Sequence, residues 1–309
     1  MELVPAQKQR VWKTPAVVNF SLGGIGAGFY FLALFVNLPG DGNWLPALLS
    51  SNAAWLPMAF LAALFKLLGV ALAGLGFIAL TTEAGRPQRG INLFRHLRRS
   101  WMSRETLAFF LFVAFAGLDW LVPNPLLRAL AALAALFLML AQGFILYRAR
   151  GVTAWNTSLM PLYFLTAGLM TGAGLLLVLF PLVNLFTPLT SSLSFAAAGI
   201  LTAILNLALW LIYLRTPDAA FQNAVAALRA PNPFWQIVGI GHLLPALLLA
   251  FAWANPAAPL SAVLEIVAGG LLLFGGVRQK WGIILQAGYL RAITLATPHL
   301  PRALGRIPN

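Results

Sequence analysis

Long, nearly uncharged apolar runs recur along almost the whole chain. A helix that crosses a bilayer needs about 20 predominantly apolar residues, and the sequence contains eight such segments. They run roughly from Pro15 to Asn37, Pro57 to Thr81, Glu105 to Pro123, Leu127 to Tyr147, Ser158 to Val183, Ser191 to Leu214, Phe234 to Ala254, and Pro259 to Val277. Because backbone polar groups in lipid must be satisfied within their own segment, the runs predict an all-α polytopic membrane helix bundle with eight transmembrane helices.

The composition supports a membrane protein and excludes several kinds of chemistry. Hydrophobic residues make up 61% of the chain and charged residues 9%, whereas a soluble domain needs a more polar surface. The N-terminal segment lacks a short apolar core followed by a small-residue cleavage site, so we expect a retained first span. The chain contains no cysteine, which excludes disulfides, thiolate-bound iron–sulfur clusters and a catalytic thiol within it.

The basic residues fall almost entirely on one side of the predicted spans. Connections on the other side, such as LPGDGNW, VPNP and NPAAP, are nearly uncharged; Arg128 is the basic residue found there, and Lys66 lies within a span. The positive-inside rule therefore places both termini in the cytoplasm, and we expect the chain in a prokaryotic cytoplasmic (inner) membrane. The net charge of +13 is then a topology signal, and we expect membrane lipid as a partner and no nucleic acid.

We divide the chain into an eight-helix transmembrane anchor domain, residues 1–277, and a basic tail, residues 278–309. The tail is partly apolar as well as basic, which is typical of a segment that lies along the cytoplasmic membrane surface.

Histidine usage limits the cofactors that the chain could hold. Of His96, His242 and His299, only His242 lies within a predicted span. A membrane haem usually needs two histidines from facing helices, so we predict no haem and no metal in this chain. A lone polar residue at membrane depth is a functional candidate. His242 is therefore either a hydrogen-bonded packing residue or a proton carrier.

The first span contains the glycine-rich stretch GGIGAG, Gly23 to Gly28. No strand precedes it, so it is not a dinucleotide-binding loop. Glycines within a span allow close approach of a neighbouring helix, or of a flat ligand. Asn19 lies one turn earlier, near the cytoplasmic end, where it could donate a hydrogen bond to a polar head group.

Three ionisable residues fall at similar depth within the spans: Lys66, Asp119 and Glu265. An isolated charge at that depth costs at least a few kcal/mol, so we expect Lys66 to pair with one or both acids. The pair would be either a structural salt bridge or part of a proton or water path. A polytopic transporter using this layer is an alternative function, although no matched pair of interrupted spans supports it.

The stretch EAGRPQRGINLFRHLRRSWMSRE, residues 83–105, carries six arginines between two glutamates. Glu83 ends the second span and Glu105 begins the third, so we expect them at one membrane level. A carboxyl group beside a buried pocket can accept or release protons, and Arg86 could hold such a group ionised or orient a ligand. The alternative for each glutamate is a helix-terminal ion pair with neighbouring arginines.

Two motifs in the chain resemble those of a known family. Gly85-Arg86-Pro87, followed by Ser100 to Glu105, is similar to the pattern G-R-P…S-W-[LM]-[ST]-R-E of dimethyl sulfoxide reductase-type membrane anchors, within the polysulfide reductase-like superfamily. Ala154 to Thr157 also resembles the W-N-T/S turn of that family. With the layout of eight spans, the resemblance covers essentially the whole chain.

The resemblance implies an anchor without a prosthetic group of its own. Such an anchor binds an iron–sulfur electron-transfer subunit and a molybdopterin catalytic subunit, and it exchanges electrons with a quinone (menaquinone or ubiquinone). The motif glycine of the quinone site carries over to Gly85 and the motif glutamate to Glu105. Many members have a histidine two residues before the glycine; the Glu83 found here is similar to anchors of phenylacetyl-CoA:acceptor oxidoreductases.

The predicted orientation adds to this implication. In exported reductases of this type the motif loop faces the periplasm, whereas here the positive-inside rule places it in the cytoplasm. The partner subunits would then be cytoplasmic and would pass electrons from a cytoplasmic substrate to quinone, as sulfite dehydrogenase complexes are thought to do. We expect Asn19, Gly85, Arg86 and Glu105 to shape the quinone pocket, with Glu83 or His242 assisting proton exchange. A passive anchor without a quinone site remains a further alternative.

Overall fold

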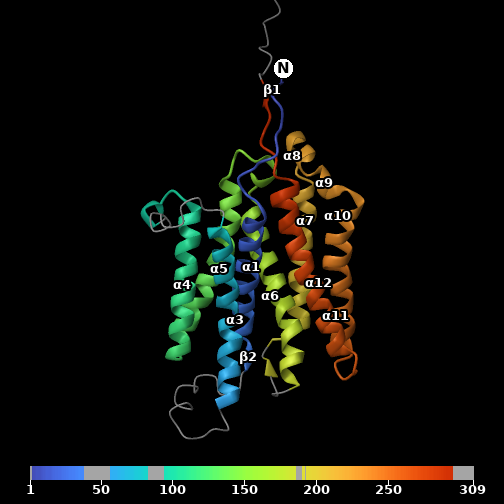
Figure 1. Ribbon diagram of the computed structural model, residues 1–309. Coiled ribbons are helices and arrows are strands. Elements are labelled where there is room, and N and C mark those ends of the chain that lie inside the picture. Colours follow the sequence, from blue (N-terminus) through green and yellow to red (C-terminus); the bar gives the residue numbers. More distant parts are fainter. Residues whose placement is uncertain (1, 38–55, 83–93, 186–189, 192, 295–309) are drawn as a thin grey trace, which may run out of the picture.

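The computed structural model describes residues 2–37, 56–82, 94–185, 190–191 and 193–294. Long helices stand side by side along one common direction (Figure 1). They are α1 (Thr14–Ala33), α3 (Leu56–Thr81), α4 (Trp101–Leu121), α5 (Pro125–Arg148), α6 (Met160–Asn184), α7 (Phe195–Leu214) and α12 (Ser261–Trp281). One more span is composite: α10 (Pro231–Trp235), the π-helical segment η3 (Gln236–Leu243) and α11 (Leu244–Ala254) follow one another without a break.

The predicted all-α polytopic bundle is confirmed. Seven of the described helical spans are long and apolar enough to cross a membrane. Helix α3 adds a shorter apolar stretch, Leu67–Thr81, within the part of the chain whose side chains are described. Large apolar side chains such as Leu247, Leu201 and Ile78 are exposed on the outside of the bundle, as expected for helices that face lipid.

Local sequence signals explain where several helices begin. Ser100 and Ser194 precede α4 and α7, and each side chain accepts a hydrogen bond from the backbone N–H three residues later. Asn124 caps α5 in a similar way by accepting from the N–H of Leu126. Such caps satisfy donors that the first turn of a helix leaves free.

Helix α1 lies in the middle of the bundle, where it contacts α3, α5, α6 and α12. Most of its residues are buried, and its glycines set how closely the neighbours approach. A Cβ atom on Gly28 would collide with the backbone of Gly168 in α6, and one on Gly26 with the backbone of Gly69 in α3. The predicted role of these glycines in close helix packing is therefore confirmed for Gly26 and Gly28.

Replacing Gly28 by leucine is expected to destabilise the bundle strongly. The new side chain would have to force apart the backbones of α1 and α6, and overpacking of a tight core costs roughly 1–3 kcal/mol or more. Thermal unfolding of the detergent-solubilised protein should shift downward by several degrees or more. Gly270→Leu is the matched control, since a Cβ atom there meets nothing within 4 Å. Equal transition temperatures for the two variants would contradict the assigned packing.

Short strands tie the two ends of the described chain together at one end of the bundle. Strand β1 (Glu2–Val4) pairs antiparallel with β4 (Ile293–Thr294), and the N–H of Gln9 donates to the carbonyl of Gly288. The first and last described segments therefore lie side by side, next to the short helices α8 (Ala219–Ala224) and α9 (Ala226–Arg229) (Figure 1). At the opposite end, β2 (Val36–Asn37) pairs with β3 (Thr190–Ser191).

The last spanning helix is longer than the sequence predicts. Helix α12 continues past Val277 to Trp281 and is followed by the π-helical turn η4 (Gly282–Gln286). The basic residues at the start of the predicted tail therefore extend the helix instead of ending it, and Lys280 is buried. Whether residues 278–309 act as a separate unit remains a prediction.

The W-N-T turn supports this extension of α12. The turn contains the short helix η2 (Thr153–Trp155), and the indole N–H of Trp155 donates to the carbonyl of Ile283, at 2.8 Å. The hydroxyl of Tyr213, near the end of α7, donates to the carbonyl of Ala154. Buried polar groups of three segments are thus satisfied in one place, which fixes the ends of α7 and α12 relative to each other.

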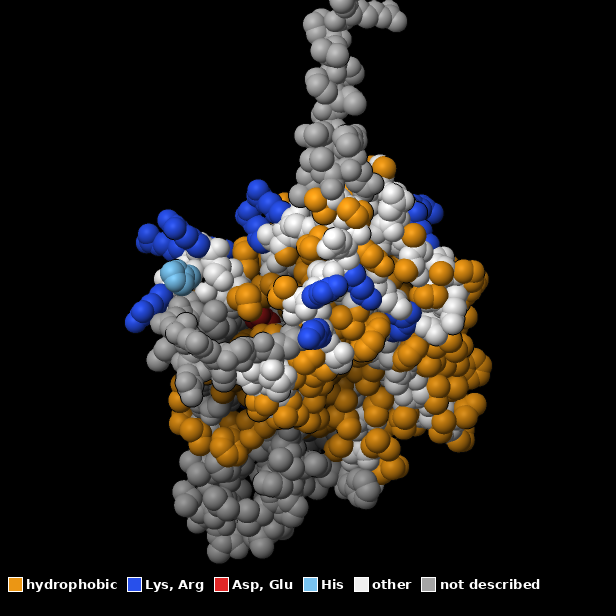
Figure 2. All heavy atoms as spheres, turned by 45° about the horizontal axis from the view of Figure 1, so that its top comes forward, with side chains coloured by type: hydrophobic (Ala, Val, Ile, Leu, Met, Phe, Trp, Pro, Cys, Tyr) orange, Lys and Arg blue, Asp and Glu red, His pale blue; other side chains and the backbone are white. Residues whose placement is uncertain are grey.

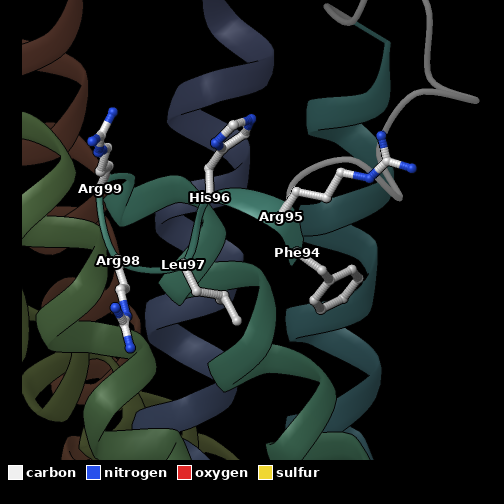
Figure 3. Close-up of a pocket in the computed structure, with 6 residues that line it drawn as sticks. All are labelled: Phe94, Arg95, His96, Leu97, Arg98 and Arg99. Carbon is white, nitrogen blue, oxygen red and sulfur yellow. The ribbon is translucent and has the colours of Figure 1, made fainter.

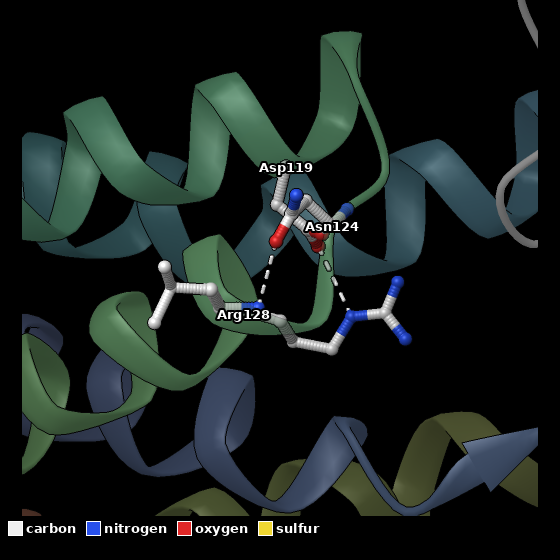
Figure 4. A network of polar contacts seen from close by, with 4 residues as sticks. Asp119, Asn124 and Arg128 are labelled. Atoms are coloured by element: carbon white, nitrogen blue, oxygen red, sulfur yellow. Dashed lines mark hydrogen bonds and ion pairs between the residues drawn. The ribbon is translucent and has the colours of Figure 1, made fainter.

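The expected layer of intramembrane charges takes a different form. Asp119 lies in the last turn of α4, where its carboxylate accepts from the backbone N–H of Asn124 and pairs with Nε of Arg128 at 3.2 Å (Figure 4). Glu265, near the start of α12, is half-buried and forms no hydrogen bond or ion pair with any described residue. The side chain of Lys66 lies outside the described residues, so its predicted pairing remains untested.

Candidate functional site

Residues of the S-W-M-S-R-E motif hold the start of α4 in place, and Glu105 is the last residue of this motif. The Trp101 ring stacks on Phe144 of α5, with centroids 4.0 Å apart. The Arg104 guanidinium lies over the Trp101 ring at 4.3 Å and donates to the backbone carbonyls of Leu97 and Arg98, each at 2.9 Å. Arg104 therefore anchors the turn that precedes α4, a structural role that the topology interpretation of the arginines did not predict.

Glu105 and Asn19 form the centre of a buried polar site. Glu105 lies one turn into α4 and is 2% exposed, and Asn19, at the corresponding end of α1, is fully buried. The Asn19 side-chain amide donates to Oε1 of Glu105, at 3.3 Å. The structure thus brings together two of the residues predicted for the pocket, although Asn19 and Glu105 are 86 positions apart in sequence.

Gln142 of α5 extends this site. It is 1% exposed, and its side-chain amide lies next to the Glu105 carboxyl group. Neither its nitrogen nor its oxygen has a hydrogen-bond partner of regular geometry among the described residues, and the same is true of Oδ1 of Asn19. Buried polar groups normally find partners, so this cluster retains hydrogen-bonding capacity that a polar ligand or water could use.

Glycines of α1 make room for the polar side chains. A Cβ atom on Gly23 would collide with Nε2 of Gln142, and one on Gly24 would lie 2.6 Å from Nζ of Lys280. The same Gly24 position lies 3.9 Å from Oε1 of Gln142. The two halves of the GGIGAG stretch therefore differ. Gly26 and Gly28 allow the backbones of neighbouring helices to pack closely, whereas Gly23 and Gly24 leave space for the side chains of Gln142 and Lys280.

Lys280 of α12 completes the cluster from the opposite side. It is 1% exposed; its Nζ donates to the carbonyl of Phe20 at 2.7 Å and lies 5.7 Å from the centroid of the Phe164 ring. Within the described residues, no carboxylate lies within ion-pairing distance of it. The site thus holds a buried acid and a buried base that do not contact each other.

The end of the bundle that contains this site is strongly basic. Figure 2 shows lysine and arginine side chains spread across this end, and an acidic side chain recessed in a hollow between them. An open pocket on the same end is lined by Phe94, Arg95, His96, Leu97, Arg98 and Arg99 (Figure 3). Its basic side chains point outward in different directions, and none of the lining residues belongs to the buried cluster. We interpret the pocket as part of the exposed basic surface at this end of the bundle, which we call the basic rim.

His242 belongs to a second buried network on the far side of α12. Its Nδ1 lies 2.8 Å from the carbonyl of Ile237 and its Nε2 lies 3.0 Å from Oδ1 of Asn206. Gln279, next to Lys280 in sequence, approaches the same ring at 3.4 Å. His242 is therefore a hydrogen-bonded residue of the bundle interior and does not contact Glu105. Its predicted part in proton exchange remains untested.

The remaining predicted site residues lie outside the described residues: Glu83, Gly85 and Arg86. Their segment connects α3 to α4. Near the end of α3, Gly76 packs on Asn19, since a Cβ atom there would lie 3.0 Å from the Asn19 carbonyl oxygen. Both helices that the segment connects therefore border the Glu105–Asn19 pair. Among the described residues, no three His, Asp or Glu side chains gather as a metal site would require.

Comparison with known proteins assigns the family. The family model for the DMSO reductase anchor subunit (DmsC) matches residues 15–230. The chain belongs to this family. The match spans α1 to α9 and includes both Asn19 and Glu105, so the anchor family's region contains one side of the buried cluster. Lys280 lies beyond the matched residues. A search for similar proteins of curated function found no match.

Proposed function

We propose that this anchor subunit reacts with membrane quinone and passes electrons between it and a partner iron–sulfur subunit. The observation that carries the proposal is the buried Glu105–Asn19 pair at the basic end of the bundle, in which Glu105 is the last residue of the S-W-M-S-R-E motif. Quinone reduction takes up protons and quinol oxidation releases them. A buried carboxyl group that accepts a hydrogen bond is suited to exchange such protons with a ring oxygen.

The DMSO reductase-type family implies partnership with an iron–sulfur subunit and a catalytic subunit. We propose that both bind at the basic end, because the Glu105 site and the S-W-M-S-R-E motif lie there. The catalytic subunit would carry molybdopterin, and the anchor would supply the quinone site. The anchor's own contribution is to bind the quinone head group, to exclude water from it, and to move protons at Glu105.

We further propose that the basic end faces the cytoplasm. The described basic residues before α1, just before α4 and after α12 lie on connections at this end, and the positive-inside rule orients such connections inward. Electrons would then flow from a cytoplasmic substrate toward quinone. The proposal of a transporter gains no support, because Asp119 is paired with Arg128 at a helix end.

Purification of the tagged chain from its native membrane tests the proposal. We expect a complex that contains iron and molybdenum and that reduces or oxidises short-chain quinones. A lone chain without metal would contradict the proposal, and so would a metal-containing complex that does not react with quinones. Transport of a solute by the lone protein in liposomes would support the alternative function.

A further inference from the structure

Lys280 is the buried ionisable residue that the proposed reaction does not yet use. Its Nζ carries three donors when protonated, and it makes one hydrogen bond, to the carbonyl of Phe20. A buried cation without a counter-ion costs several kcal/mol in a membrane protein. An apolar residue would pack here without that cost, and the single bond to Phe20 leaves the other donors of Lys280 unused.

The unfilled hydrogen bonds of the site are concentrated on one face of α1. The donors of Lys280, both polar atoms of Gln142 and Oδ1 of Asn19 have bonding capacity left among the described residues. Gly24 lies between the first two: its Cβ position is 2.6 Å from Nζ of Lys280 and 3.9 Å from Oε1 of Gln142. Gln142 in turn lies next to Glu105. Lys280, Gln142, Asn19 and Glu105 therefore lie around the same stretch of α1, from Asn19 to Gly24.

Charge and surroundings limit which ligand suits this surface. A phosphate or another anion would approach Lys280 but would be repelled by a carboxylate at Glu105. A neutral ligand that offers one oxygen to each of the two groups avoids this conflict. The Phe164 ring lies 5.7 Å from Nζ of Lys280, so the ligand should also be flat and apolar between its oxygens. A quinone head group has these properties.

On the basis of the proposed function, we propose that Lys280 is a quinone-binding residue. It would donate a hydrogen bond to the ring oxygen that lies farther from Glu105. In this arrangement Glu105 and Asn19 hold one oxygen of the ring, and Lys280 holds the other. Gln142 lies between them and can donate to or accept from either oxygen. Helix α12 thereby becomes the second wall of the site, although it lies outside the segment that matches the anchor family.

The test is Lys280→Met in the purified complex, which removes the donor and keeps a long, unbranched side chain. Loss of the donor would leave the buried quinone oxygen without a hydrogen-bond partner, so we expect KM for short-chain quinones to rise about 10- to 100-fold. The amount of native quinone extracted with the complex should fall in parallel. Turnover with an artificial dye that takes electrons directly from the partner subunits should be unchanged.

Arg278→Met is the matched control, because it removes a basic side chain two residues away on the same helix. Arg278 bonds Gln236 and Gln286 and is not part of the site, so KM should stay near the wild-type value. If Lys280→Met fails to assemble, Lys280→Gln retains a donor without charge and should give an intermediate KM. Unchanged KM and quinone content in an assembled Lys280 variant would overturn the inference and leave the proposed function standing. Absence of quinone reactivity in the wild-type complex would instead overturn the proposed function.

Discussion

Glu105→Gln should reduce quinone-linked turnover of the complex on the order of 100-fold or more. General acid–base catalysis contributes roughly that factor, and the amide cannot exchange the proton. The substitution keeps size and retains an oxygen at the position that accepts from Asn19, so the fold should persist. The measurement is steady-state turnover with a short-chain quinone, compared with turnover on a dye that bypasses the anchor.

Glu265→Gln is the control for this experiment. Glu265 is also a partly buried glutamate of the bundle, but it makes no hydrogen bond or ion pair within the described part of the chain. Its replacement should leave both activities near the wild-type level. Undiminished quinone turnover in Glu105→Gln would mean that the chain is a passive anchor or that another group exchanges the proton.

Single-cysteine labelling should show that the two ends of the bundle lie on opposite sides of the membrane. The chain has no cysteine of its own, so one introduced thiol gives an unambiguous signal. Arg98→Cys places it on the exposed basic rim, and Ala257→Cys places it in the exposed turn between α11 and α12, at the opposite end. In intact spheroplasts, a membrane-impermeant maleimide should label the Ala257 variant and leave the Arg98 variant unlabelled.

Lysis provides the internal control for the labelling. Once the membrane is opened, the Arg98 variant should react to a similar extent as the Ala257 variant, which shows that its thiol is accessible. The reverse pattern in intact cells would place the basic end, and with it the partner subunits, on the outer side. The direction of electron flow proposed above would then lose its basis.

The overall architecture could be predicted because lipid imposes a simple rule on the sequence. Each run of about 20 apolar residues must form a helix, and those at Glu105 to Pro123 and Ser158 to Val183 correspond closely to α4 and α6. The end of the last span was wrong. Basic residues such as Arg278 and Lys280 usually mark the end of a span, whereas here both lie within the helix: Arg278 is bonded to neighbouring amides and Lys280 is buried.

The Glu105–Asn19 part of the site could be predicted from the sequence, but the contribution of Lys280 from α12 could not. Asn19 and Glu105 were both expected near the cytoplasmic end, and a hydrogen bond joins them. Gln142 gave a weak signal as an uncharged polar residue inside an apolar run. Lys280 gave none, because a basic residue after a span is the usual topology signal. Only packing of α12 against α1 shows that this lysine points inward.

The intramembrane charges illustrate a different limit. Counting residues along a helix gives depth along the bundle but no information about which helices are neighbours. Asp119 was expected to need a partner and has one, but the partner described is Arg128, nine residues later, across the turn between α4 and α5. A local ion pair at a helix end is less costly than one at the midplane, since the Arg128 side chain remains partly exposed although Asp119 is buried.

Pairing of the first strand with the last has a consequence for biosynthesis. Residues 2–9 are made before α1, yet their partners at 284–294 emerge from the ribosome only after the described helices α1 to α12 have been made. Synthesis runs at roughly 5–20 residues per second, so the N-terminal segment remains unpaired for a time on the order of tens of seconds. The surface formed by these strands therefore exists only on a chain translated past residue 294, and a partner that docks there would select chains that contain α12 over chains truncated before it.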